Sequence, residues 1–253
     1  MPEPEPVLVR CEIDEGVAVL TLDDPAHRNA LGLDLTRALA AAVDMAEAAD
    51  VGAIVLAAEP PVFCAGGSLD DLLAPRAPLR ETYAGYLALA GASVLTIAAV
   101  DGPAIGAGVN LPLACDVVLC SPAARFDPRF LDVGIAPGGG HLWRLARRVG
   151  RQGAAVMVLG GDALDGPTAE RAGLAWRCIP TAELLPAAIA MARRAADRPR
   201  DLARRTKAML GQTVELGDPA DAFDAELELQ DWSMQQQEFK DRVEAIRRRT
   251  QRR

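Results

Sequence analysis

The order of apolar and polar residues in the first quarter of the chain predicts strands and one amphipathic helix. Two apolar-rich runs, residues 7–12 and 17–22, flank the turn Asp14-Glu15-Gly16 and predict a β-hairpin. Residues 34–49 predict a helix, because leucine, valine and alanine recur there every three or four positions. Residues 51–58 are continuously apolar, as in a parallel strand covered on both faces. Strand, helix and parallel strand in this order form a right-handed crossover.

This alternation continues to about residue 180, after which strand patterns end. We expect, in order, a loop at 59–78, a helix at 79–90, a strand at 94–100, a helix at 107–114, a strand at 116–120, helices at 139–147, 152–159 and 168–172, and a strand at 176–179. Segments 181–197, 199–210 and 219–248 predict helices. The sequence therefore predicts an α/β core, residues 1–195, and a helical C-terminal region, residues 196–253. In that region Phe223, Leu227 and Met234 form an apolar stripe that favours contact with another surface.

Composition narrows the class of protein. The chain has 253 residues, half of them hydrophobic, and a formal net charge of -8. The negative charge gives no general attraction to nucleic acid or to an anionic membrane, so an anionic ligand needs a local basic site. No signal peptide or membrane span is expected from the pattern. The five cysteines form no CxxC pair, and their odd number favours reduced thiols in a cytoplasmic protein.

Several familiar catalytic motifs are absent from the sequence. Neither lysine belongs to a Gly-Lys-Ser/Thr phosphate loop, and the two histidines stand apart without the spacing of a zinc site, so no metal is expected. Ser68 lies in Gly-Gly-Ser-Leu-Asp rather than in a GxSxG elbow. Its simplest role is to cap the turn that follows. The final residues, RRRTQRR, predict a solvated helix end, with contact to a ligand phosphate or a neighbouring subunit as the alternative.

Two glycine-rich segments remain as the candidate site. Residues 63–72 read FCAGGSLDDL and residues 100–111 read VDGPAIGAGVNL, and each follows a predicted strand. Small residues let a ligand approach the backbone closely, and a helix that begins near Ala107 presents unpaired N–H groups at its positive end. Two such N–H groups from separate loops can converge on one oxygen atom. The residues by themselves leave open the alternative of two tight turns in a crowded core.

These segments occur within a longer series that resembles the crotonase (enoyl-CoA hydratase/isomerase) family. The series is Arg28-Asn29-Ala30-Leu31, then FCAGGSLDDL, then VDGPAIGAGVNLPLACDVV, then ARFDPRFLDVGIAPGGGHLWRLARRVG, in this order and without large insertions. The resemblance extends over residues 7–250. It implies a spiral of ββα units, with C-terminal helices that assemble a homotrimer or a dimer of trimers.

The resemblance also implies the substrate and the binding residues. An acyl-coenzyme A thioester would be the ligand, with coenzyme A as part of the substrate and no separate cofactor. The two N–H donors of the family's oxyanion hole fall on Gly67 and Ala107. Such donors stabilise the enolate that forms when a proton leaves the carbon beside the carbonyl. The adenine end of coenzyme A lies near the first loop in the family, so the binding candidates are Arg28, Ala30, Ala65, Gly66 and Leu69.

The sequence departs from the family at the residues that handle protons. Hydratases of the family use two glutamates, and these positions hold Asn110 and Phe130 here. Asn110 can orient a water molecule but cannot accept a proton near neutral pH, and Phe130 can do neither. This departure argues against conventional hydratase chemistry. An isomerase or another enolate reaction with one acid remains open, and so does a non-catalytic acyl-CoA-binding protein.

Other residues are candidates for the missing proton acceptor. Asp132 is the nearest carboxylate, although a solvated or turn-capping acid is an equally good interpretation. Asp127 is the second candidate, and Asp70 and Asp71 in the first loop are more distant. His141 follows Gly138-Gly139-Gly140 and reads either as a polar first-turn residue or as a general base. Asp116 resembles the family's structural aspartate, and we assign it no chemistry.

Overall fold

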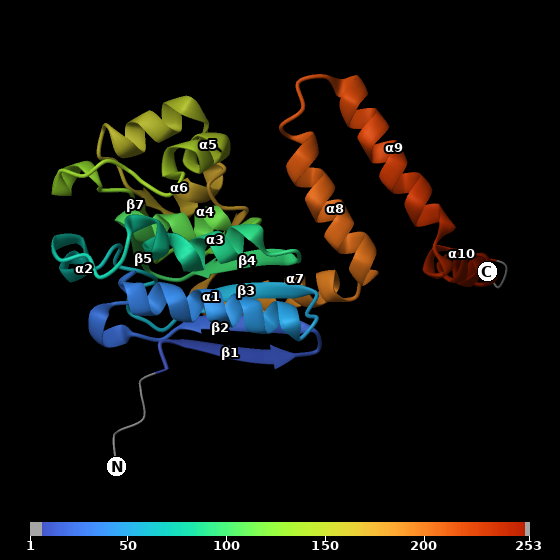
Figure 1. Ribbon diagram of the computed structural model, residues 1–253, viewed down its shortest axis with the longest axis horizontal. Coiled ribbons are helices and arrows are strands. Elements are labelled where there is room, and N and C mark those ends of the chain that lie inside the picture. Colours follow the sequence, from blue (N-terminus) through green and yellow to red (C-terminus); the bar gives the residue numbers. More distant parts are fainter. Residues whose placement is uncertain (1–6, 251–253) are drawn as a thin grey trace, which may run out of the picture. The chain divides into compact units, whose positions relative to one another are not determined.

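The computed structural model describes residues 7–250 (Figure 1). The chain folds as two compact units, Met1–Ala196 and Asp197–Arg253, which are described separately below. The last three residues of the basic C-terminal segment lie outside the described residues. Among residues 7–250, no helix is both long and apolar enough to cross a membrane.

A six-stranded sheet forms the centre of the first unit, in the order β1-β2-β3-β4-β6-β9. The strands β1 and β2 form the predicted antiparallel hairpin, and every later pair in the sheet is parallel. The bounds are β1 Val9–Asp14, β2 Val17–Leu22, β3 Ala53–Ala58, β4 Leu95–Val100, β6 Val117–Cys120 and β9 Arg177–Cys178. Parallel neighbours need crossover connections, and the helices between the strands supply them.

Helices cover both faces of this sheet, which explains the continuous apolar runs in its strands. Alternate residues of the sheet pack with α1, Leu33–Ala48, and α3, Ala84–Gly91, in one hydrophobic cluster. The residues between them face α7, Thr181–Ala196, in a second cluster. For example, Ile54 belongs to the first cluster and Val55 to the second. Figure 1 shows α1 and α7 on opposite sides of β2 and β3.

A second, three-stranded sheet in the order β5-β7-β8 was not expected from the sequence. Its strands are β5 Pro103–Ile105, β7 Arg125–Asp127 and β8 Leu164–Asp165. Strands of two or three residues are too short to show an apolar periodicity, so the pattern could not indicate them. This sheet bears on the candidate site because β5 is part of the second glycine-rich segment, residues 100–111.

The remaining helices of the first unit follow the prediction with local corrections. The expected loop 59–78 contains a short helix, α2 Leu69–Leu73, which Ser68 caps by accepting a hydrogen bond from the Asp71 amide at 3.3 Å. The predicted helix at 79–90 begins with a 3₁₀ segment, Leu79–Tyr83, before α3. The helices predicted at 139–147 and 152–159 form the two halves of α5, His141–Val158, which breaks at Gly150 with φ +73°. The helix predicted at 168–172 is α6, Gly166–Arg171.

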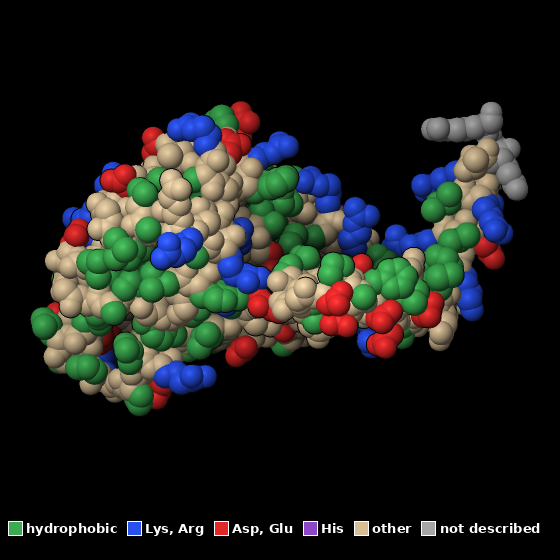
Figure 2. Space-filling model, turned by 90° about the horizontal axis from the view of Figure 1, so that it is seen from above, with side chains coloured by type: hydrophobic (Ala, Val, Ile, Leu, Met, Phe, Trp, Pro, Cys, Tyr) green, Lys and Arg blue, Asp and Glu red, His purple; other side chains and the backbone are tan. Residues whose placement is uncertain are grey.

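The second unit is entirely helical within its described residues. It contains α8 Arg200–Thr213, α9 Pro219–Gln235 and α10 Gln237–Thr250. A single helix over 219–248 was predicted, and this prediction is wrong. Gln236 has φ -72° and ψ 145°, an extended conformation that ends α9. Figure 2 shows hydrophobic side chains beside acidic ones on this part of the chain. The stripe residues Phe223, Leu227 and Met234 are exposed.

Candidate active site

The two glycine-rich loops lie side by side. The Cys64 amide donates to the Pro103 carbonyl at 3.1 Å, and the Ile105 amide donates to the Cys64 carbonyl at 2.9 Å. These bonds form a parallel bridge between Cys64 and Ala104. The two loops follow β3 and β4, which are parallel neighbours in the main sheet. Both loops therefore begin at the same edge of the sheet, where the carboxyl ends of the strands lie. Segments almost 40 residues apart in sequence are thus fixed against each other by main-chain hydrogen bonds.

Glycine is required where the loops touch. A Cβ atom on Gly66 would lie 2.7 Å from the Ile105 carbonyl oxygen and 3.7 Å from the Ala107 nitrogen, and its φ of +103° favours glycine. A Cβ atom on Gly108 would lie 2.5 Å from the Cys64 carbonyl oxygen. The small residues therefore allow main chain to pack on main chain. They bring the segment containing Gly67 next to the one containing Ala107.

The surroundings of Gly67 and Ala107 differ from those of the glycines beside them. Both residues are partly exposed, although their neighbours Gly66 and Gly108 are buried. Within residues 7–250, the Gly67 amide donates no backbone hydrogen bond outside regular helices and strands. Ala107 lies in the first turn of a 3₁₀ helix, Gly106–Val109, where N–H groups have no partner inside the helix. The α-helix α4, Asn110–Ala114, begins three residues later than the predicted start.

Residues 28–31 lie beside the first loop and pair with it through main-chain hydrogen bonds. The Ala65 amide donates to the Arg28 carbonyl at 3.0 Å, and the Leu31 amide donates to the Gly66 carbonyl at 2.6 Å. The structure therefore brings together four of the five coenzyme A candidates, Arg28, Ala30, Ala65 and Gly66. Leu69, the fifth, is the exposed first residue of α2. Arg28 is exposed, so its guanidinium is open to solvent beside this loop.

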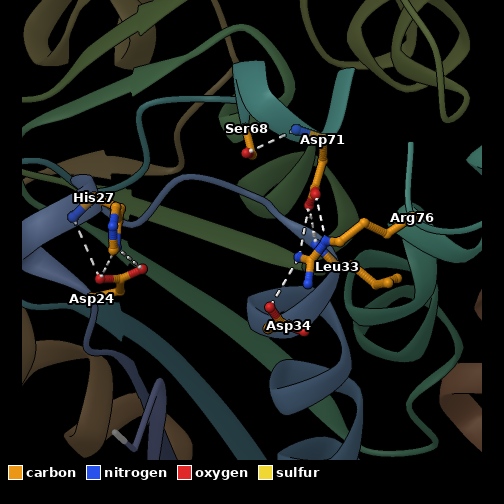
Figure 3. A network of polar contacts seen from close by, with 7 residues as sticks. All are labelled: Asp24, His27, Leu33, Asp34, Ser68, Asp71 and Arg76. Atoms are coloured by element: carbon orange, nitrogen blue, oxygen red, sulfur yellow. Dashed lines mark hydrogen bonds and ion pairs between the residues drawn. The ribbon is translucent and has the colours of Figure 1, made fainter. Parts of the chain in front are cut away.

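A polar network fixes the end of the first loop to the start of α1 (Figure 3). The Asp71 carboxylate accepts from the Leu33 amide at 2.8 Å and from Arg76 Nε at 2.7 Å, and Arg76 also pairs with Asp34. The hydrogen bond from Arg76, followed by that from Leu33, holds the pKa of Asp71 below its usual value. Asp71 thus replaces a side-chain cap on Gly32, which has none. The ionised carboxylate of Asp71 therefore has a structural role, because it accepts hydrogen bonds from Leu33 and Arg76.

Asn110 and His141 form a buried pair. Nδ1 of His141 lies 2.7 Å from Oδ1 of Asn110, and Nδ2 of Asn110 donates to the Gly138 carbonyl at 3.3 Å. The Phe130 ring lies edge-on to the imidazole, with centroids 4.9 Å apart. Burial lowers the pKa of His141 to about 4, so the ring is neutral at physiological pH. The two positions that depart from the hydratase pattern therefore both contact His141.

The aspartates near Phe130 have different surroundings. Asp132 is exposed in a 3₁₀ turn, Leu131–Val133, which agrees with the solvated interpretation without testing a catalytic one. Asp127 is buried and forms ion pairs with Arg125 and Arg129. Burial opposes its ionisation, but the pair with Arg129 and then that with Arg125 outweigh this effect and lower its pKa. Asp116 accepts from the Thr96 amide at 2.8 Å and from its hydroxyl at 3.0 Å, a structural contact.

Sequence reasoning missed two tyrosines beside Asn110. Tyr86 donates through its hydroxyl to the Gly139 carbonyl, and Arg144 donates to the same hydroxyl at 3.2 Å. Tyr83 packs so closely that a Cβ atom on Gly139 would lie 2.8 Å from its ring. These contacts join residues more than 50 positions apart and belong to no motif, so no signal in the sequence indicated them.

Residues 7–250 show no cluster of metal ligands, and a hollow among them involves neither of the two loops. Among the described residues, no group of three or more histidine, cysteine or acidic side chains could hold a metal ion. A hollow of about 390 Å³ is lined by residues of β6, α5 and α6 and includes neither loop. Arg148, which lines this hollow, donates hydrogen bonds to the carbonyls of Cys115 and Asp116. Its guanidinium therefore already has partners within the protein. The two loops remain the better candidate for a reacting site.

Comparison with known proteins decides the family. The family model for enoyl-CoA hydratase/isomerase matches residues 12–251, nearly the whole chain. The chain belongs to the enoyl-CoA hydratase/isomerase family. Among curated members, a probable enoyl-CoA hydratase, EchA14, of Mycobacterium tuberculosis is 40% identical over 223 residues, 86% of each chain. A probable enoyl-CoA hydratase of Rhodobacter capsulatus is 39% identical over 177 residues, 68% of each chain.

Solved structures of the family share the fold. An enoyl-CoA hydratase from Mycobacterium smegmatis superposes with a TM-score of 0.87 at 29% identity and covers 97% of both chains. A protein of Thermobifida fusca assigned as an enoyl-CoA hydratase, and solved in complex with CoA, gives a TM-score of 0.82 at 29% identity, covering 90% of this chain and 93% of its own. The α/β fold expected from the family resemblance is thereby confirmed.

Proposed function

We propose that this protein binds acyl-CoA thioesters and stabilises their enolate with the amide groups of Gly67 and Ala107. The observation that carries this proposal is the pair of hydrogen bonds that ties Cys64 to Pro103 and Ile105. These bonds fix the two donor-bearing loops before a ligand arrives. Donors fixed in advance stabilise developing charge without a cost of reorganisation.

The chemistry follows from where negative charge appears. When a base removes a proton from the carbon beside a thioester carbonyl, the electron pair moves onto the carbonyl oxygen. Two N–H groups directed at that oxygen bind the enolate more tightly than the neutral thioester, so they lower the barrier. One such donor contributes roughly 10²–10³-fold in rate. Main-chain donors need no particular side chain, which accounts for glycine and alanine at these positions.

Coenzyme A enters this proposal as part of the substrate, without a separate cofactor or metal. The candidates for its adenine end are Arg28, Ala30, Ala65, Gly66 and Leu69, which lie along the first loop and the segment paired with it. Arg28 supplies a solvent-exposed positive charge suited to a phosphate group in a chain of net negative charge. The CoA complex of the Thermobifida fusca relative supports this class of ligand.

The proposed reaction is an isomerase-like or other enolate reaction rather than conventional hydration. Asn110 and Phe130 stand where two glutamates would be needed, and neither side chain exchanges protons near neutral pH. The same observation supports a second candidate, a non-catalytic acyl-CoA-binding protein. Measurable turnover of any acyl-CoA or enoyl-CoA thioester separates the two. We further propose a cytoplasmic homotrimer or dimer of trimers.

The test removes the N–H group of Gly67 and compares the result with a substitution that keeps this group. Gly67→Pro deletes the N–H group, whereas Gly67→Ala keeps it and places a Cβ 3.5 Å from Leu72, an ordinary contact. Binding to a panel of acyl-CoA and enoyl-CoA thioesters is measured by calorimetry, and turnover by absorbance and mass spectrometry. We expect Gly67→Pro to lose roughly 10²–10³-fold in turnover and Gly67→Ala to lose much less. Equal binding and turnover in Gly67→Pro and the natural protein contradicts the assignment of the donor.

A further inference from the structure

One of the two histidines of the chain has an unused nitrogen in the interior. His141 is 1% exposed, and its Nε2 atom has no hydrogen-bond partner among residues 7–250. A buried polar atom without a partner is destabilising, so such atoms are uncommon in folded proteins and each one calls for an explanation. The other histidine, His27, is exposed and pairs with Asp24.

The surrounding hydrogen bonds determine the protonation state of this ring. The Asn110 amide nitrogen donates to the Gly138 carbonyl, so its oxygen is the atom that faces Nδ1 of His141. An amide oxygen only accepts, and therefore Nδ1 carries the proton. The neutral ring then has its lone pair on Nε2. Burial lowers the pKa of His141 to about 4 and keeps this neutral form at physiological pH.

The imidazole is hydrogen-bonded to Asn110, which directly follows the 3₁₀ helix that contains Ala107. The backbone N–H of Asn110 donates to the Ala107 carbonyl, so Asn110 follows Ala107 by one helical turn. Among the side chains packed around this pair, Phe130 cannot exchange protons. Burial raises the pKa of Tyr83, which packs against Gly139, so its hydroxyl stays protonated. His141 is thus the side chain in this cluster that can accept a proton.

We propose that Nε2 of His141 is the proton acceptor for a thioester held by Gly67 and Ala107, and that Asn110 is its positioning residue. This inference rests on the proposed function. In the step, the bond between the carbon beside the carbonyl and its hydrogen breaks, an N–H bond forms at Nε2, and the electron pair moves onto the carbonyl oxygen. The imidazolium then returns the proton to the same carbon or to one two positions further along an unsaturated chain. Return of the proton to the carbon two positions further along gives double-bond migration. Return to the same carbon gives hydrogen exchange when the imidazolium N–H has first exchanged with water, which is the only other reactant.

Hydrogen exchange into a saturated thioester tests the chemical step. The full chain is incubated with butyryl-CoA in D₂O, and deuterium at the carbon beside the carbonyl is followed by NMR and mass spectrometry. We expect exchange in the natural protein, a loss of roughly 10²–10⁴-fold in His141→Gln, and an unchanged rate in His27→Gln. Full exchange in a folded His141→Gln protein overturns the inference, and so does a comparable loss confined to Asp132→Asn.

A second measurement does not depend on turnover. Nitrogen-15 NMR of the His27→Gln protein reports on His141 alone, because the chain has two histidines. We expect a protonated Nδ1 and an unprotonated Nε2, and in Asn110→Ala a shift of the proton toward Nε2 together with slower exchange. A proton on Nε2 in the natural protein overturns the inference, whatever the rates.

The two proposals fail in different ways. If Gly67→Pro loses exchange and His141→Gln does not, the amide donors are supported and the role of His141 is rejected. If the natural protein binds butyryl-CoA without exchange, both the enolate chemistry and the base are rejected and the acyl-CoA-binding alternative is supported. If it does not bind any acyl-CoA, the proposed function itself is rejected.

Discussion

Gly108 packs directly against the main chain of Cys64. A Cβ atom on Gly108 would lie 2.5 Å from the Cys64 carbonyl oxygen and 3.0 Å from both Cβ and Sγ of Cys64. The same Cys64 carbonyl accepts the hydrogen bond from Ile105 that joins the two loops. One missing side chain therefore allows the contact on which the spacing of Gly67 and Ala107 depends.

Gly108→Ala is expected to lower the free energy of unfolding by about 1–3 kcal/mol, because backbone has to move to admit the methyl group. Urea denaturation followed by circular dichroism measures this loss. Gly91→Ala is the matched control, since a Cβ atom there has no neighbour within 4 Å. A Gly108→Ala protein as stable as Gly91→Ala would contradict the close approach of the loops.

Asp71→Ala is expected to cost about 1 kcal/mol, because it removes the cap on the Leu33 amide at the start of α1. The neighbouring Asp70→Ala is the control, because Asp70 is exposed in the same short helix. Chemical denaturation compares the two. If Asp70→Ala costs as much as Asp71→Ala, the loss comes from α2 and not from the cap.

His141 predicts an acid-sensitive stability. The pKa of its imidazole is about 4 in the folded protein and 6.5 without burial, so between these values the unfolded chain binds more protons. The free energy of unfolding therefore falls as the pH falls from about 7 to about 4, on the order of 3 kcal/mol from this group. Urea denaturation at a series of pH values measures the slope, and His141→Gln should reduce it. An identical pH dependence in both proteins contradicts the burial of a neutral imidazole.

The apolar stripe on α9 predicts self-association. Phe223 is 64% exposed and Leu227 41% exposed in the single chain, and burying such side chains is favourable. We expect a trimer or hexamer by analytical ultracentrifugation, and smaller species for Leu227→Glu. Glu228→Gln, an exposed change that leaves the stripe intact, is the control. A monomer at all concentrations would reject the predicted assembly.

The sequence indicated the central strands of the main sheet well, because β3 and β4 each have six residues and are covered on both faces. Residues 51–58 contain β3, and residues 94–100 contain β4, with starts that differ by one or two positions. The sequence pattern did not predict the small second sheet or the end of α9 at Gln236. Strands of two or three residues have no periodicity to detect, and a single extended residue between two helical segments leaves the surrounding pattern unchanged.

What the sequence determined by itself was the family, the two glycine-rich loops and the substitution of Asn110 and Phe130 for acidic residues. These features are local, since each depends on residue types within one short segment. Only the tertiary structure decided which residues meet: His141 with Asn110, Phe130 with His141, and Tyr83 with Gly139. Such contacts join segments brought together by packing of the whole core, and no spacing along the chain encodes the direction in which a buried ring presents its free nitrogen.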